Sequence, residues 1–68
     1  MNKESREFGR NMKRIRTAKG LTQGDISRSL KLARSFITNI ENGKANPTLS
    51  TINKLAKAIG VSAGELVK

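Results

Sequence analysis

Cysteine and histidine are both absent from this sequence of 68 residues, and so are tryptophan and tyrosine. Without Cys or His, the chain can form no disulfide and no zinc site built from these ligands. A chain of this length is near the lower limit at which one apolar core can fold alone. We therefore expect a single domain over residues 1–68, held together by aliphatic packing and containing no metal or other cofactor.

Long apolar runs are also lacking, since none exceeds three residues. A helix needs about 20 apolar residues in succession to cross a bilayer, so no segment is expected to span a membrane. Residues 1–10 are polar and lack the apolar middle of a signal peptide. These features predict a cytoplasmic protein with no membrane partner.

Acidic residues are scarce: five Asp and Glu stand against fourteen Lys and Arg, which gives a formal net charge of +9. Half of the basic residues lie within the first 19 positions. Such a balance favours a partner with dense negative charge, and nucleic acid is the leading candidate. A basic surface kept only for solubility is one alternative. An anionic membrane is another, but the basic residues alternate with core positions instead of flanking one large apolar face.

Helical periodicity runs through the chain. The first amphipathic stripe has spacings of four, three and three residues and consists of Phe8, Met12, Ile15 and Ala18. Ser5 is the candidate N-cap of this helix, and Gly20 ends it. In the second helix, Thr22 is the expected N-cap and Asp25 stands in the capping-box position. Its inward residues are Ile26 and Leu30.

Three residues, 31–33, separate the second helix from a third that should run from about Arg34 to Asn42. The expected buried stripe of the third helix is Ala33, Ile37 and Ile40. Gly43 then ends it. A polar loop over 44–47 contains the only proline, which cannot lie inside a helix.

A fourth helix begins with Thr48 or Ser50 as its N-cap and ends at Gly60. Its expected stripe is Leu49, Ile52, Leu55, Ala56 and Ile59. Ser62 and Glu65 form an S-x-x-E capping box that opens a last short helix. The sequence therefore predicts an all-α fold, a compact bundle of five helices without strands.

The short gap between the second and third helices has a functional consequence. Helices joined by about three residues must cross at a large angle, which allows one of them to project into the major groove of DNA. The third helix offers polar residues at spacings of one, four and five, and these share a face: Arg34, Ser35, Thr38 and Asn39. Arg suits guanine, Asn suits adenine, and Ser and Thr accept either base.

These segments together resemble the Cro/repressor-type (XRE-like) helix-turn-helix regulators of phages and bacteria. The similar stretches are RIRTAKGLTQ (Arg14–Gln23), IxxIENGKxNP (Ile37–Pro47) and LxxINKLAKAIGVSAGEL (Leu49–Leu66). The resemblance implies a lambda-repressor-like DNA-binding domain with its helix-turn-helix at about residues 22–42. The RSFI and NPTLSTINKLAKAIGV segments are also similar to the controller proteins of restriction–modification systems.

The same resemblance implies roles for individual residues. The positions expected to face base edges in double-stranded DNA are Arg34, Ser35, Thr38 and Asn39. The positions expected to contact the DNA backbone are Gln23, Phe36, Asn42, Lys44 and Thr48, although Phe36 could equally pack against a neighbouring helix. Arg16 and Glu41 match a buried salt bridge that ties the first helix to the third.

Two positions depart from the family pattern. Lys31 occupies the turn position that is usually glycine, where a left-handed backbone would cost about 1 kcal/mol. Ala33 replaces the usual Ser or Thr cap of the third helix, which forfeits an N-cap hydrogen bond worth about 1 kcal/mol. These departures place the start of the third helix in question.

The resulting hypothesis is a sequence-specific transcriptional regulator that binds a palindromic operator as a homodimer and controls its own promoter. The expected dimerisation region covers about residues 58–68, with an interface of Ile59, Val61, Leu66 and Val67. Recognition helices in such a dimer lie about 34 Å apart, one turn of DNA. RNA polymerase is a further candidate partner, and the expected location is the nucleoid.

Two alternatives belong to other functional classes. One is an antitoxin or another protein-interaction module in which DNA binding is secondary, and the other is a non-specific architectural binder. Catalysis has little support, because the sequence offers no His or Cys nucleophile and no glycine-rich phosphate loop. No catalytic residue and no metal ligand is therefore expected.

Overall fold

The computed structural model describes residues 3–68, which fold into five α-helices. Their bounds are α1 Lys3–Ala18, α2 Gln23–Leu30, α3 Arg34–Glu41, α4 Leu49–Ile59 and α5 Ala63–Val67. Residues 3–68 contain no strand. The all-α, five-helix prediction is confirmed, and the third helix ends one residue earlier than the pattern indicated.

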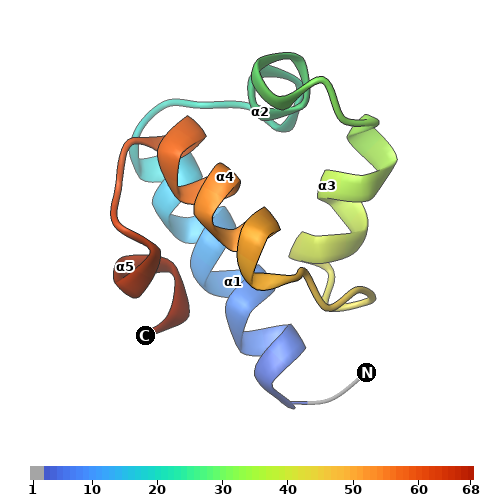
Figure 1. Cartoon of the computed structure of the whole chain (residues 1–68), viewed down its shortest axis with the longest axis vertical. Coiled ribbons are helices and arrows are strands. Elements are labelled where there is room, and N and C mark those ends of the chain that lie inside the picture. Colours follow the sequence, from blue (N-terminus) through green and yellow to red (C-terminus); the bar gives the residue numbers. More distant parts are fainter. Residues whose placement is uncertain (1–2) are drawn as a thin grey trace.

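The helices are arranged around α1, which contacts α3 on one side and α5 on the other (Figure 1). α4 lies in front of α1 in this view and contacts α2 and α5. The fully buried side chains come from all five helices and include Met12, Ile26, Ile37, Ile40, Leu55 and Leu66. Burial of this aliphatic core is the main favourable term in folding.

Most of the predicted helix ends are confirmed. Thr22 with Asp25 and Ser62 with Glu65 both form complete capping boxes. Thr48, and not Ser50, caps α4, since its hydroxyl accepts a hydrogen bond from the Thr51 N–H at 3.2 Å. Gly20, Gly43 and Gly60 all adopt positive φ after helices, as expected of C-terminal glycines.

Ser5 does not cap α1, because the helix already begins at Lys3. Its side chain is instead buried and donates a hydrogen bond to Asn46 Oδ1 in the loop that follows α3. A position that looked like a local cap therefore links the start of α1 to a loop 41 residues away. The periodic pattern of one helix could not reveal this contact.

Three residues assigned to buried stripes are exposed in the structure: Ala18, Ala33 and Leu49. Ala18 is the last residue of α1, and Ala33 precedes the first turn of α3. Leu49 begins α4 and is 72% exposed, so no other described helix covers it. All three lie at helix ends. There the apolar periodicity of the sequence continues beyond the residues that neighbouring helices cover.

Close contact between α1 and α3 depends on Gly9. A Cβ atom at this position would lie 2.4 Å from the Ile40 carbonyl oxygen and 2.5 Å from that of Glu41. Any side chain would push the helices apart, since both neighbours are backbone atoms. This approach fixes α3 against α1 and thereby the direction in which its outer face points.

Candidate nucleic-acid interface

The segment that joins α2 to α3 is a sharp, hydrogen-bonded turn. Lys31 adopts the left-handed conformation with φ 56° and ψ 40°. The Ser27 carbonyl accepts hydrogen bonds from the N–H groups of Lys31 and Leu32, and the Ser27 hydroxyl donates to the Leu32 carbonyl. The chain thus enters α3 at Arg34 in a new direction, with no side-chain hydrogen bond from Ala33. Both departures from the family pattern are real features of the turn.

α3 has one buried face and one polar face. Ile37, Ile40 and Glu41 are buried against the other helices. On the outer side, Arg34, Ser35 and Asn39 are exposed and Thr38 is half-buried. The four residues predicted to contact base edges are therefore brought together on the accessible part of α3. That face offers donors and acceptors of the kinds that base edges bind.

A buried ion pair anchors α3 to α1, as the family resemblance implied. Arg16 Nε donates to Glu41 Oε2 at 2.7 Å, and Arg16 Nη2 donates to Glu41 Oε1 at 2.9 Å. The side chains are 10% and 1% exposed respectively. The hydrogen bond and charge of Glu41 raise the pKa of Arg16 against the opposing effect of burial. Arg16 Nη1 also donates to the Leu21 carbonyl at 2.7 Å, so the pair also holds the loop before α2.

Gln23, the first residue of α2, extends this pair into a network. Its Nε2 donates to Glu41 Oε1 at 2.9 Å, and its Oε1 accepts from the Thr38 hydroxyl at 2.9 Å. The sequence interpretation gave Gln23 and Thr38 roles at the DNA surface, and the hydrogen bonds show that both residues also hold α2 to α3. Because the two residues lie 15 positions apart on different helices, no spacing rule could have paired them.

The flanking residues predicted to contact the DNA backbone differ in exposure. Asn42, Lys44 and Thr48 are exposed beyond the C-terminal end of α3, although the Thr48 hydroxyl already caps α4. Phe36 is half-buried and packs against the core, which favours the structural alternative for this ring. Lys44 is exposed, and its side chain makes no hydrogen bond within residues 3–68. Among these residues, its ammonium group is therefore the most accessible to a phosphate.

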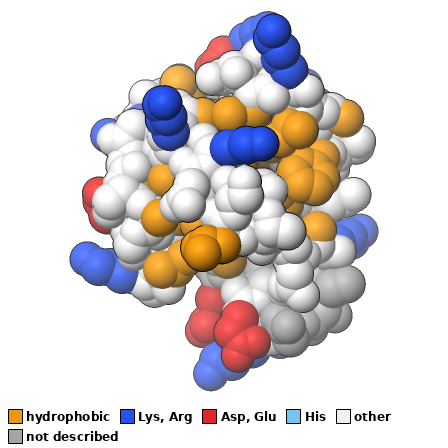
Figure 2. All heavy atoms as spheres, in the orientation of Figure 1, with side chains coloured by type: hydrophobic (Ala, Val, Ile, Leu, Met, Phe, Trp, Pro, Cys, Tyr) orange, Lys and Arg blue, Asp and Glu red, His pale blue; other side chains and the backbone are white. Residues whose placement is uncertain are grey.

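One basic residue of α1, Arg6, lies next to the same region. Gly43, directly after α3, approaches α1 so closely that a Cβ atom there would lie 2.8 Å from Arg6 Cγ. Arg10 and Lys13 are also exposed on α1, and Arg10 lies near Asn11 and Lys68, on the side of α5. By contrast, the face with α4 in front shows isolated Lys and Arg side chains among hydrophobic groups (Figure 2). The chemistry of that face does not match a continuous DNA-binding surface.

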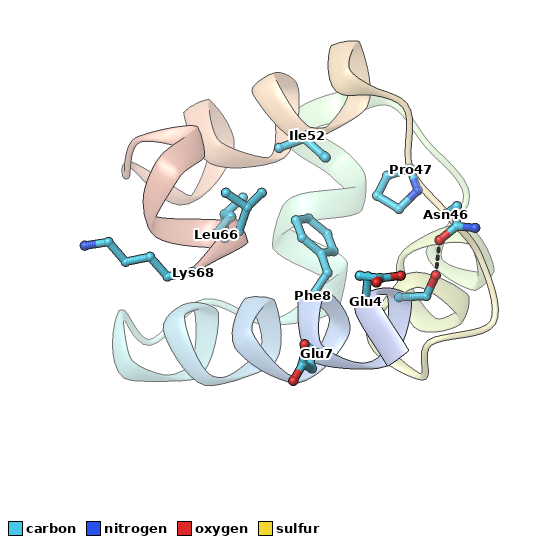
Figure 3. A pocket seen from close by; sticks show the side chains of 10 residues that line it. Glu4, Glu7, Phe8, Asn46, Pro47, Ile52, Leu66 and Lys68 are labelled. Atoms are coloured by element: carbon cyan, nitrogen blue, oxygen red, sulfur yellow. Dashed lines mark hydrogen bonds between the residues drawn. The ribbon is translucent and has the colours of Figure 1, made fainter. Parts of the chain in front are cut away.

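The predicted dimer interface needs correction. Ile59 and Leu66 are 3% and 0% exposed in a single chain, so they belong to the core and offer no surface to a partner. Leu66 instead lines a hollow with Phe8 and Ile52 (Figure 3). Val61 is half-buried and Val67 is 58% exposed. Only these two valines remain available, and their role at an interface stays a prediction.

The position of α5 depends on Asn11, which the sequence interpretation did not single out. Its Nδ2 donates to the carbonyl oxygens of Glu65 and Leu66 at 2.8 and 2.7 Å. These carbonyls are at the C-terminal end of α5, where no intrahelical donor is available. Asn11 therefore attaches the last helix to α1 on the side away from α3.

Residues 3–68 contain no cluster of three metal-ligating side chains. Nor does any helix within them have the length and apolarity needed to cross a membrane. What the described surface offers is therefore a polar helical face with basic side chains beside it. Such a face suits the recognition of an anionic polymer with patterned hydrogen-bonding groups.

Comparison with known proteins places this geometry in a family context. Residues 12–66 match the helix-turn-helix family. The chain is 41% identical over 59 residues to an uncharacterised HTH-type transcriptional regulator of Sinorhizobium fredii, a match that covers 87% of this chain and 77% of the relative.

Solved structures support the same relationship. The restriction–modification controller protein C.AhdI from Aeromonas hydrophila superposes with a TM-score of 0.90 at 35% identity, covering 96% of this chain and 98% of that one. The controller protein C.Esp1396I, solved as a tetramer in complex with its natural operator, has a TM-score of 0.84 at 26% identity, with full coverage of both chains.

Proposed function

The chain belongs to the helix-turn-helix family, and from this membership we propose that it is a transcriptional regulator that binds a specific double-stranded DNA operator. The polar outer face of α3 carries the proposal. It is presented by a fold that superposes on a controller protein in complex with operator DNA. The identity to C.AhdI favours a role as the controller of a restriction–modification system, acting on its own promoter.

We assign the residues of the surface to two kinds of contact. Base edges in the major groove would be contacted by Arg34, Ser35, Thr38 and Asn39. The sugar–phosphate backbone would be contacted mainly by Lys44, with Gln23, Asn42 and Thr48 as further contacts. Phe36 could add an apolar contact to a sugar from the edge of its packing site. Base contacts determine sequence preference, whereas phosphate contacts supply affinity that depends on salt.

A homodimer is part of the proposal. One recognition helix contacts only a few base pairs, so two copies on a palindrome provide the specificity that a regulator requires. Val61 and Val67 are the accessible candidates for the dimer surface. A protein with this function would act at the nucleoid in the cytoplasm, and RNA polymerase is the proposed partner through which it represses or activates.

Two variants test the binding mode in salt-titrated mobility-shift assays. Arg34→Ala should relax base preference at one position in each half-site, because it removes a base contact. Lys44→Ala should weaken binding to all sequences alike and reduce the salt slope by about one phosphate contact. Identical behaviour of the two variants would contradict this division.

Dimerisation is tested separately, in the absence of DNA. Sedimentation equilibrium should show a dimer at micromolar concentrations and a shift toward monomer for Val67→Glu. Lys54→Glu is the matched control, since this exposed charge lies on α4 outside the proposed interface. A wild-type protein that stays monomeric would contradict dimerisation before DNA binding.

A further inference from the structure

We propose that Thr38 recognises a base amino group in the major groove, either adenine N6 or cytosine N4, and does not recognise guanine or thymine by a hydrogen bond. The proposal rests on the proposed function, because it concerns how the outer face of α3 distinguishes bases. It follows from the hydrogen bonds that already occupy the Thr38 hydroxyl.

A hydroxyl group has one proton to donate and two lone pairs that accept. In this structure two carbonyl oxygens of the protein compete for the Thr38 proton. Gln23 Oε1 lies 2.9 Å from Thr38 Oγ1, and the Arg34 carbonyl oxygen lies 3.1 Å away. Whichever oxygen receives the proton, it stays within the protein. Thr38 therefore presents only its accepting side to a ligand.

The orientation of Gln23 makes this arrangement stable. Its Nε2 donates to Glu41 Oε1, which is buried and also bound by Arg16. With the amide turned over, its oxygen would face the carboxylate and its NH₂ would face Thr38. That would place two acceptors against each other in a buried site, which is costly. The buried ion pair thus fixes Gln23, and Gln23 fixes the Thr38 hydroxyl.

The base groups that fit an accepting hydroxyl follow from the major-groove pattern. Adenine N6 and cytosine N4 carry donor hydrogens, whereas guanine O6 and N7 and thymine O4 only accept. A hydroxyl without a free proton would place lone pair against lone pair at guanine or thymine. Threonine in general tolerates either class of base, but this threonine should not.

Ser35 provides an internal control on the same helix. It is exposed, and its hydroxyl makes no hydrogen bond within residues 3–68. Ser35 can therefore rotate its hydroxyl to donate or to accept. The two hydroxyl residues of the outer face are chemically alike, yet the network restricts only one of them.

The first experiment is selection from a random DNA pool with the wild-type protein, Thr38→Val and Ser35→Ala. Thr38→Val keeps the side-chain shape and removes the acceptor. It should lose a preference for adenine or cytosine at one position per half-site and bind the selected operator about five- to tenfold more weakly. Ser35→Ala should leave the preference at that position unchanged. Thr38→Ser retains the acceptor and should therefore show the same preference for adenine or cytosine as the wild type.

The second experiment separates base recognition from a structural role. Replacing the contacted adenine by purine, or the contacted cytosine by pyrimidin-2-one, removes only the amino group. The wild-type protein should lose about five- to tenfold in affinity for the modified operator, while Thr38→Val should lose nothing further. Circular dichroism and thermal melting establish that each variant is folded.

Either of two results would overturn the proposal: a Thr38-dependent preference for guanine or thymine, or equal sensitivity of wild type and Thr38→Val to the modified base. A wild-type protein with no preference over random DNA at fixed salt would instead overturn the proposed function, and the recognition proposal with it. The two failures are therefore distinguishable.

Discussion

Two junctions of this molecule have the same backbone plan and very different sequences. α2 is followed by Lys31, Leu32 and Ala33 before α3, and α4 is followed by Gly60, Val61 and Ser62 before α5. In both, the first residue is left-handed, the second is a half-buried aliphatic residue, and the third is an extended N-cap. The α4–α5 junction uses the residues that favour this geometry, whereas the α2–α3 junction uses neither a glycine nor a capping side chain.

The difference shows that the same turn conformation can be stabilised either by local residue preferences or by contacts between helices. At the α4–α5 junction, Gly60 and the Ser62–Glu65 capping box favour the turn locally. At the α2–α3 junction, the local preference is weak, and contacts from elsewhere hold the two helices. These contacts are the network of Arg16, Glu41, Gln23 and Thr38, and the Ser27–Leu32 hydrogen bond adds a local contact within the turn itself.

The largest effect is expected from breaking the network that supports the weaker junction. Arg16→Ala leaves Glu41 as a buried charge without its ion-pair partner and should lower the free energy of unfolding by about 3–5 kcal/mol. Urea denaturation followed by circular dichroism measures the change. Arg28→Ala is the control, because its ion pair with Asp25 is exposed and should contribute less than about 1 kcal/mol. Similar losses for both variants would show that the network does not support the junction.

Exchanging the left-handed residues should change stability in opposite directions. Lys31→Gly relieves a strained conformation and should raise the free energy of unfolding by about 1 kcal/mol. Gly60→Lys introduces the same strain and should lower it by about the same amount. A Cβ atom at Gly60 meets nothing within 4 Å, so the effect is conformational and not a steric clash. Thermal melts of the two variants test whether the junctions are equivalent in geometry.

Exchanging the N-cap residues of the two junctions should change the free energy of unfolding by a similar or smaller amount. Ala33→Ser should add a hydrogen bond at the start of α3 and raise the free energy of unfolding by about 0.5–1 kcal/mol. Ser62→Ala should remove one from α5 and lower it by about 1 kcal/mol. If Ala33→Ser had no effect in urea denaturation, the missing side-chain cap would not lower the stability of α3.

The smallest effect is expected from the pH dependence of the α2 cap. The pKa of Asp25 is lowered, first by the Thr22 backbone N–H and then by the Thr22 side chain and Arg28. Its contribution is therefore fully present above its unfolded pKa of about 3.9 and is lost as pH falls through the lower folded value. Between pH 5 and pH 3, Asp25→Asn should show a smaller decrease in Tm than the wild type. Equal decreases would exclude this source of acid sensitivity.

Local signals in the sequence predicted most of the fold. The helix ends at Thr22, Gly43, Gly60 and Ser62 follow from capping preferences that operate within a few residues. Errors arose where a side chain serves a distant contact or where a stripe reaches a helix end. Ser5 binds the loop after α3, and Leu49 lies beyond the covered part of α4. Neither can be inferred from periodicity, because both depend on what lies opposite.

The candidate interface was predicted in the same partial way. Helical spacing placed Arg34, Ser35, Thr38 and Asn39 on one face, and the structure brings them to the outer side of α3. The likeness to a known family supplied the Arg16–Glu41 pair, which the structure contains. Neither source indicated that Gln23 bonds to Thr38, nor that Leu66 is buried within one chain. The stripe of the fourth helix had already placed Ile59 among the inward residues, which conflicts with its assignment to a dimer interface.

By itself, the sequence determined where the helices are, which residues face outward from α3, and that the chain carries a strong positive charge. These properties depend on backbone preferences and composition, which act locally or additively. Only the tertiary structure decided how α2 and α3 are held and which protons on the outer face are free. Hydrogen bonds between helices depend on the relative placement of residues far apart in the chain, and no local pattern encodes that placement.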